Sequence, residues 1–285
     1  MDMVAFGSPQ VVADRLREVG YLPTDEIATT IFLASVLGKP VLVEGPAGTG
    51  KTELAKAVAR AWGLDLVRLQ CYEGLDESKA LYEWDYRKQL LALQSHDDDL
   101  GSVFDEAFLL ERPLLRALRM TSDRLLLIDE VDRLEIETEA LLLEVLAEFQ
   151  VTIPELGTLA ATSRPLVVLT SNGVRDLSEA LKRRALFLFL DYPDPERERA
   201  IVLEAVPGIE ASLADAIARF VASVRELDVK KRPSIAETID WARALVVLGA
   251  DVLDRETVET TLSLLLKHRH DIERVRRELL GAASA

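Results

Sequence analysis

The sequence contains a single cysteine, Cys71, in 285 residues. An internal disulfide is therefore excluded, and one thiol without a partner is typical of a reducing compartment. The sequence also lacks any apolar run of the roughly 18 residues that a membrane-spanning helix requires, and its N-terminal residues show no basic stretch followed by an apolar one. We therefore expect a cytoplasmic protein with no membrane span.

Basic residues are outnumbered in this chain. It has 34 Lys and Arg against 49 Asp and Glu, which gives a net charge of −15. A field of this sign disfavours non-specific attraction to nucleic acid or to anionic lipid, so we expect no nucleic-acid partner. Hydrophobic residues make up 49% of the chain, which at this length is enough for one large core or two moderate ones and excludes a disordered tail-like protein.

The stretch Glu44–Thr52 follows a short apolar run and opens an amphipathic helical pattern. Its glycines allow the backbone to curl tightly with N–H groups pointing inward, beside the positive end of the next helix dipole. Lys51 can then reach the β- and γ-phosphates of a nucleotide, and the Thr52 hydroxyl can ligate Mg²⁺. An ordinary glycine-rich turn on the surface would need neither a strand before it nor a helix after it, so this context favours a phosphate-binding loop. The predicted nucleotide-binding residues are Gly45, Pro46, Ala47, Gly48, Thr49, Gly50, Lys51 and Thr52.

Residues 124–130 form the second informative stretch, an apolar run that ends in two carboxylates. Such a run predicts a buried central strand that delivers Asp129 and Glu130 at its carboxyl end, where ligands bind in open parallel sheets. Asp129 is placed to hold Mg²⁺, and Glu130 to polarise an attacking water. An apolar strand that ends in Asp-Glu is common by itself, and it becomes informative here because it lies downstream of Lys51 and Thr52.

Another apolar run, residues 166–171, ends at Asn172. The Asn172 amide is predicted to contact the attacking water or the γ-phosphate, although Asn followed by Gly173 is also a turn signal. A short helix at 178–184 then ends in cations that include Arg183 and Arg184. Cations at a helix C-terminus stabilise the helix without any further function, but Arg is also the residue that neutralises charge on a transferring phosphoryl group from a neighbouring subunit.

The remaining patterns predict a nucleotide-binding α/β domain at 1–192 and a helical domain at 193–285. In the first domain, helices are expected within 3–38 (one from Ile27 to Leu37, with a cap at residues 24–26 and an end at Gly38), at 104–120 and at 134–149. Strands are expected at 40–43, 66–70 and 185–190, and a hairpin at 151–160. Periodicity is weak over 71–100, which contains Tyr82, Trp84, Tyr86 and the acidic run Asp97–Asp99; a solvated loop with anchoring rings and a substrate-contacting surface both remain open there.

The second domain begins after the prolines at 193 and 195 and shows no strand pattern. Its expected helices lie at 196–206, 212–227, 234–248, 256–266 and 271–280. His268 and His270 are two residues apart, so on a helix they point in nearly opposite directions and cannot share a metal. Trp241 is expected in the core.

These parts, in this order, resemble an AAA+ ATPase: a Walker A motif at 45–52, a Walker B motif at 125–130, a sensor at Asn172, two arginines before the fifth core strand and a helical lid. Within that class, the phosphate loop, the hairpin after Phe149 and the Tyr192-Pro193 ending resemble the MoxR family. Residues 75–86 and 233–238 resemble its CoxD-type branch.

The resemblance implies a P-loop NTPase fold, with a parallel sheet sandwiched by helices and a small all-α lid, that uses ATP and Mg²⁺. It implies a ring, usually a hexamer, in which Arg183 of a neighbour is the finger and Arg184 the next candidate. It also implies chaperone-like remodelling beside a von Willebrand factor A domain protein, with a client metalloenzyme of the molybdenum hydroxylase or carbon monoxide dehydrogenase type. The family's sensor 2 arginine is absent, because residues 234–237 read Ser-Ile-Ala-Glu; Arg232 and Arg243 are the possible substitutes.

Three other functions are alternatives to a MoxR-type remodelling ATPase. A DNA-acting AAA+ motor or clamp-loader-like ATPase is disfavoured by the net charge and by the lack of an added DNA-binding motif. A small-molecule P-loop kinase would need an acceptor site and leaves the helical lid unexplained. A nucleotide-binding scaffold that barely hydrolyses is disfavoured by the intact Asp129 and Glu130 pair, although the missing sensor 2 arginine is compatible with it.

Overall fold

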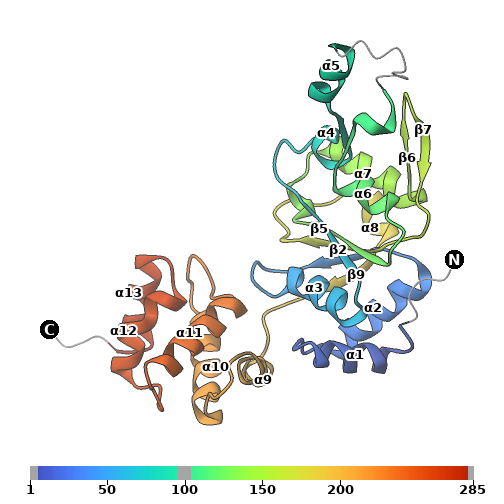
Figure 1. Cartoon of the computed structure of the whole chain (residues 1–285). Helices are drawn as coiled ribbons and strands as arrows, with labels where there is room; N and C mark the ends of the chain where they lie inside the picture. Colours follow the sequence, from blue (N-terminus) through green and yellow to red (C-terminus); the bar gives the residue numbers. More distant parts are fainter. Residues whose placement is uncertain (1–5, 95–103, 282–285) are drawn as a thin grey trace. The chain divides into compact units, whose positions relative to one another are not determined.

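The computed structural model describes residues 6–94 and 104–281, so the acidic run Asp97–Asp99 lies outside the described residues. The chain divides into two compact units (Figure 1). The first comprises Met1–Gly45 and Lys51–Phe189, and the second comprises Pro46–Gly50 and Leu190–Ala285.

A five-stranded parallel sheet forms the centre of the first unit, in the order β2-β5-β8-β1-β9. The strands are β1 (Val41–Glu44), β2 (Asp65–Gln70), β5 (Arg124–Asp129), β8 (Leu166–Ser171) and β9 (Leu186–Phe189). Every residue of β5 and β8 is buried, as the continuous apolar runs of strands covered on both faces require. Because all five strands are parallel, β1, β5 and β8 end at the same edge of the sheet. The predicted fold class is confirmed.

Helices cover both faces of this sheet (Figure 1). On one side lie α1 (Pro9–Glu18), α2 (Asp25–Leu37) and α3 (Lys51–Trp62), and on the other lie α6 (Pro113–Arg119) and α7 (Ile136–Glu148). The predicted cap and end of α2 are confirmed, since the Thr24 hydroxyl accepts a hydrogen bond from the Ile27 N–H and Gly38 ends the helix at a φ of 63°. The helix begins at Asp25, two residues before the predicted start at Ile27.

The segment between β2 and β5 differs from its prediction. Residues 71–94 contain α4 (Glu77–Ala80), β3 (Tyr82–Trp84) and α5 (Tyr86–Gln94) in place of a plain loop. The single helix predicted over 104–120 is wrong. That stretch forms a short 3₁₀ turn η1 (Glu106–Phe108), then β4 (Leu109–Glu111), which pairs antiparallel with β3, and α6 begins only at Pro113.

Other elements of the first unit match the sequence pattern. A 3₁₀ turn η2 (Val131–Arg133) precedes α7, and the predicted hairpin is confirmed as β6 (Gln150–Ile153) and β7 (Gly157–Ala160). Helix α8 (Glu179–Arg184) begins after Ser178, whose hydroxyl accepts a hydrogen bond from the Leu181 N–H.

In the second unit, every regular element that the structure describes after Leu190 is a helix. Its helices are α9 (Pro195–Ala205), α10 (Ala211–Glu226), α11 (Ile235–Val247), α12 (Arg255–Leu265) and α13 (Arg269–Glu278), which confirms the five predicted helices. Trp241 is fully buried and donates from Nε1 to Thr261 Oγ1 at 2.8 Å, so the predicted core role is confirmed. His268 caps α13, and His270 is largely exposed.

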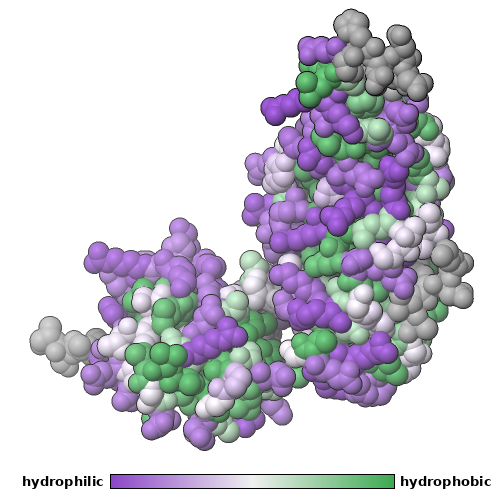
Figure 2. All heavy atoms as spheres, viewed as in Figure 1, coloured by the Kyte–Doolittle hydropathy of each residue, from purple (hydrophilic) through white to green (hydrophobic). Residues whose placement is uncertain are grey.

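Hydrophilic residues predominate on the face drawn in Figure 2, with hydrophobic ones scattered among them. Acidic residues outnumber basic ones by 15, which agrees with a surface of this kind. Among the described residues, no helix has both the length and the apolar character needed to cross a membrane.

A buried ion pair ties two helices of the second unit together. The Arg225 guanidinium of α10 makes a two-pronged contact with the Glu198 carboxylate of α9, at 2.5 and 2.8 Å, and its Nε donates to the Pro233 carbonyl. Both side chains are almost fully buried. Each charge therefore depends on the other for the interactions that water would otherwise supply.

The substitution Arg225→Met should leave the buried Glu198 carboxylate without its cationic partner. We expect the free energy of unfolding to fall by about 3 kcal/mol in urea denaturation. The matched control is Arg219→Met, because Arg219 pairs with Asp215 on an exposed face of the same helix and should cost less than about 1 kcal/mol. Equal losses in the two variants would contradict this prediction.

Candidate functional site

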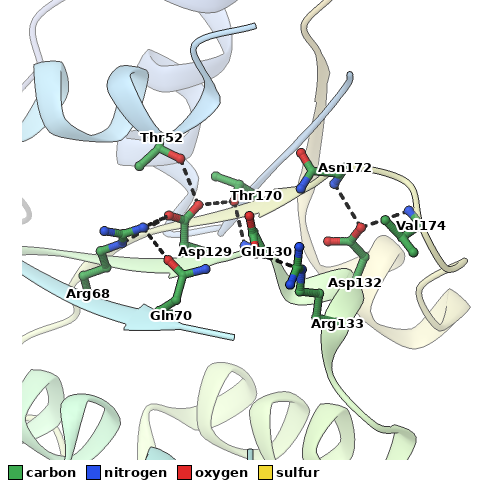
Figure 3. Close-up of polar contacts among 10 residues, drawn as sticks. All are labelled: Thr52, Arg68, Gln70, Asp129, Glu130, Asp132, Arg133, Thr170, Asn172 and Val174. Carbon is green, nitrogen blue, oxygen red and sulfur yellow. Dashed lines mark hydrogen bonds and ion pairs between the residues drawn. The ribbon is translucent and has the colours of Figure 1, made fainter. Parts of the chain in front are cut away.

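The Asp129 carboxylate lies at the carboxyl end of β5 and is the centre of the site (Figure 3). Its Oδ1 accepts hydrogen bonds from Thr52 Oγ1 of α3 at 3.0 Å and from Thr170 Oγ1 of β8 at 2.5 Å. Its Oδ2 accepts from Arg68 of β2, with Nη2 at 2.5 Å and Nε at 3.1 Å. Side chains from three other elements therefore converge on one carboxylate that is only 3% exposed.

Glu130 follows directly, and its backbone is unusual. It has a φ of 59° and a ψ of 48°, a left-handed conformation that non-glycine residues seldom adopt. The Glu130 N–H donates to Thr170 Oγ1 at 2.9 Å, and the carboxylate pairs with Arg133 Nε at 2.9 Å. Backbone strain of this kind persists only where neighbours hold it in place, and it is concentrated at functional sites.

Lys51 is the first residue of α3 and is buried. Its Nζ donates to the Gly45 carbonyl at 2.7 Å. Burial lowers the pKa of the Lys51 ammonium, and the nearby carboxylates, with Asp132 the strongest and Asp129 next, act in the opposite direction. An ammonium that is short of solvent beside an anion site is well placed to receive a phosphate.

The loop between Gly45 and Lys51 has the backbone that a phosphate cradle requires. Gly48 and Gly50 have φ values of 82° and 92°, and Thr49 Oγ1 donates to the Pro46 carbonyl at 3.0 Å. Pro46–Gly50 is grouped with the second unit, within which the Ile235 N–H donates to the Gly48 carbonyl at 3.1 Å. A Cβ added to Gly48 would lie 2.2 Å from Ser234 Cβ, so only glycine fits there.

Asn172 lies directly after β8, at the same sheet edge as Asp129. Its backbone N–H, together with that of Val174, donates to Asp132 Oδ2 at 3.1 and 2.9 Å (Figure 3). The other oxygen of the buried Asp132 carboxylate has no hydrogen-bond partner among the described residues. Asp132 therefore holds the backbone that carries the Asn172 amide beside the predicted site.

Arg183 and Arg184 lie at the end of α8 and are exposed. The Arg183 side chain is 81% exposed and lies 4.0 Å from the Glu179 carboxylate, while Arg184 donates to the Ala180 carbonyl at 3.4 Å. These contacts lie on their own short helix. The structure thus gathers Lys51, Thr52, Asp129, Glu130 and the Asn172 backbone at one sheet edge and leaves the two arginines facing solvent.

The chemistry of this edge suits a nucleotide with a divalent cation. The Thr52 hydroxyl donates a hydrogen bond to Asp129, so the lone pairs of the hydroxyl oxygen are free to ligate a cation. Among the described residues, no group of three or more His, Cys, Asp or Glu side chains could hold a metal alone. A cation at Thr52 would thus take further ligands from phosphate and water, as Mg²⁺ does in nucleotide sites.

Comparison with known proteins identifies the family. The sequence profile of AAA, the ATPase family associated with various cellular activities, matches residues 41–190, more than half of the chain. The chain belongs to the AAA family. As a member of this ATPase family it is an ATP hydrolase, and the profile spans Lys51, Asp129 and Asn172.

Its relatives share most of its length. An uncharacterized protein of Staphylococcus epidermidis is 24% identical over 86% of this chain and 90% of its own, and one of Staphylococcus aureus is 25% identical over the same shares. A solved variant of RuvB from Thermotoga maritima has a TM-score of 0.50 at 22% identity, over 90% of this chain and 72% of that one. Another, titled the Thermotoga maritima RuvB Holliday junction branch migration motor, has a TM-score of 0.47 at 20% identity, over 88% and 69%.

Four residues that contact Asp129, Glu130 or the Asn172 backbone were not predicted from the sequence: Arg68, Thr170, Asp132 and Arg133. A signal existed for two of them. Thr170 is a polar residue near the end of a buried apolar strand, and Asp132 lies three residues after Asp129. Arg68 alternates with buried neighbours on β2, a pattern that also fits an ordinary solvated face.

Cys71 follows β2 beneath the AAA site, and its backbone N–H donates to the Asp129 carbonyl at 2.8 Å. The thiol is buried. Burial, with a smaller contribution from the Asp129 charge, raises the pKa of Cys71 to about 12. The thiolate is the reactive form, so this cysteine should be inert in the folded protein.

We expect iodoacetamide at pH 8 to alkylate native Cys71 roughly 1,000-fold more slowly than the same residue in denaturant, because the thiolate fraction falls with the raised pKa. Mass spectrometry of the intact chain measures this directly, since the sequence has no other cysteine. Native labelling at the rate of the denatured chain would show that the thiol is accessible.

Proposed function

We propose that this AAA protein binds ATP with Mg²⁺ at the carboxyl ends of β1, β5 and β8 and hydrolyses it within a ring of identical subunits. The observation that carries the proposal is the convergence on Asp129. Thr52, at the start of the helix after the phosphate loop, and Thr170, near the end of a neighbouring strand, both donate to the same carboxylate oxygen. The phosphate loop and the acidic strand end are thereby brought to one place.

Each residue then has a role that its surroundings support. Lys51 and the loop 45–50 would bind the phosphates, and Thr52 with Asp129 would hold Mg²⁺, which neutralises charge on the β- and γ-phosphates. Glu130, about one third exposed, would accept the proton of the attacking water. Its pairing with Arg133 is near the surface and therefore weak enough to break when substrate binds.

The two exposed arginines support catalysis across a subunit boundary. Within one chain their contacts stay on α8, and an arginine aimed at a γ-phosphoryl group from a neighbour would be exposed in the isolated subunit. We assign the finger to Arg183, with Arg184 as the second candidate. A ring, usually a hexamer in the MoxR family, would complete every site in this way.

Within AAA proteins we place the chain in the MoxR family, CoxD-type branch. The hairpin β6–β7 follows Phe149 as that resemblance expects, and Tyr192-Pro193 follows β9. Hydrolysis would then drive chaperone-like remodelling, or metal-centre maturation, of a client enzyme of the molybdenum hydroxylase type. A von Willebrand factor A domain protein would recruit the client in the cytoplasm.

The alternative is a DNA-acting motor. Such a motor would move along nucleic acid and would need basic residues facing its phosphates. The net charge of −15 argues against a DNA track, because binding to the phosphate backbone depends on Lys and Arg contacts.

Glu130→Gln should retain ATP and lose turnover. Removal of the general base is expected to lower kcat by roughly 100-fold or more, with ATP affinity changed little, because the amide keeps the shape but not the basicity of the carboxylate. Phosphate release and equilibrium ATP binding are measured on the same preparation. Unchanged turnover removes Glu130 from this role, and strong stimulation of the wild type by duplex or single-stranded DNA would favour the motor.

Arg183→Ala should leave ATP binding intact and lower kcat on the order of 1,000-fold, because the lost charge acts only on the transition state. Mixing Arg183→Ala subunits with Glu130→Gln subunits should restore part of the activity, since each intact site would receive its arginine from the other variant. Lys182→Ala is the adjacent control. Loss in Arg184→Ala alone would move the finger by one residue, and no recovery on mixing would contradict action across subunits.

A further inference from the structure

Arg68 is a cationic partner of Asp129 that lies outside the motifs found in the sequence. Its guanidinium donates two hydrogen bonds to Asp129 Oδ2, and Nη2 also contacts Gln70 Oε1. Figure 3 shows this group on the side of the carboxylate away from Asn172. Both oxygens of Asp129 are thus occupied by donors that the protein itself supplies.

The Asp129 carboxylate requires such a donor when no metal is bound. It is 3% exposed, and the carboxylates of Glu130 and Asp132 follow within three residues. A buried anion without a compensating cation is costly. Thr52 and Thr170 offer neutral hydrogen bonds on Oδ1, so Arg68 supplies the cationic contact on Oδ2.

Arg68 is also able to leave. Its side chain is 44% exposed, and it belongs to β2, an edge strand on which residues 66, 68 and 70 are all exposed. Arg124 of β5 is the opposite case, because it is buried and donates to the carbonyls of Ala117, Ser122 and Ser163. A half-exposed guanidinium regains water when it moves, whereas a buried one loses contacts that nothing replaces.

We propose that Arg68 is a placeholder cation, which holds Asp129 until Mg²⁺ with a nucleotide takes over that carboxylate. The inference rests on the proposed Mg²⁺–ATP site. A cation that must be displaced competes with the metal, so Arg68 raises the Mg²⁺ concentration at which tight nucleotide binding begins. Arg68 is then a residue that sets the metal requirement of the site, without contact to the phosphates.

The test is Arg68→Met, which keeps an unbranched apolar stem and removes the charge and the hydrogen-bond donors. The affinity for ADP is measured by calorimetry across a Mg²⁺ titration and in excess EDTA. We expect the Mg²⁺ midpoint to fall on the order of tenfold, the value of a lost charged hydrogen bond, and the affinity in EDTA to stay the same. Arg68→Lys, which keeps a cation but not the two-pronged contact, should give an intermediate midpoint.

The matched control is Arg175→Met. Arg175 is 34% exposed and donates to the buried carboxylate of Glu139, so its loss removes the same kind of ion pair from the same unit. This variant should lower the thermal midpoint and leave the Mg²⁺ dependence alone. An equal shift in both variants would overturn the proposal, because a general loosening would then explain it.

Two further results would also overturn the placeholder role. An unchanged Mg²⁺ midpoint in Arg68→Met would show that Arg68 does not compete with the metal. Equal losses of ADP affinity with Mg²⁺ and with EDTA would make Arg68 a phosphate ligand. Failure of the wild type to bind ADP at any Mg²⁺ concentration is a separate outcome, since it would remove the nucleotide site and the inference with it.

Discussion

The structure of the first unit depends on placing one charged carboxylate where almost no water reaches it. Asp129 terminates a strand whose six residues are all buried, and an anion there must be surrounded by donors. Those donors come from α3, β8 and β2, at positions 41 to 77 residues away from Asp129 in the sequence. The helix after the phosphate loop and two neighbouring strands are therefore fixed relative to β5 by the demand of a single side chain, in addition to the apolar packing around it.

Two adjacent carboxylates acquire different chemistry from this arrangement. Asp129 is saturated with hydrogen bonds and suits a role in holding a cation. The Glu130 side chain is about one third exposed and pairs with Arg133, and its backbone adopts the left-handed conformation directly after the strand. Thr170 serves both, because it donates to the Asp129 carboxylate and accepts from the Glu130 N–H. The two neighbouring carboxylates therefore differ in their hydrogen-bond partners and in their exposure to water.

The sequence was sufficient for the parts of this unit that depend on local pattern. Apolar runs predicted β5 and β8, and the polar residues at their ends predicted one common edge, because parallel strands share their direction. The sequence was insufficient where contacts with residues far away in the chain determine the local structure or the site. Residues 109–111 look helical in isolation, but they pair with Tyr82–Trp84, and only the tertiary register reveals this. Arg68 was missed for the same reason, since its partner is 61 positions away.

The arginines of the first unit can be ordered by how much solvent they would give up or regain on moving. Arg124, the first residue of β5, is buried and donates hydrogen bonds to backbone carbonyls. Arg68 is half exposed and pairs with the Asp129 carboxylate. Arg183 is exposed and lies 4.0 Å from the Glu179 carboxylate. A guanidinium that is already hydrated changes partners at little cost in free energy. A buried guanidinium cannot change partners without leaving polar groups unsatisfied. The more exposed an arginine of this unit is, the more easily it can change partners. The arginines suited to respond to a nucleotide are therefore those that remain partly exposed to water.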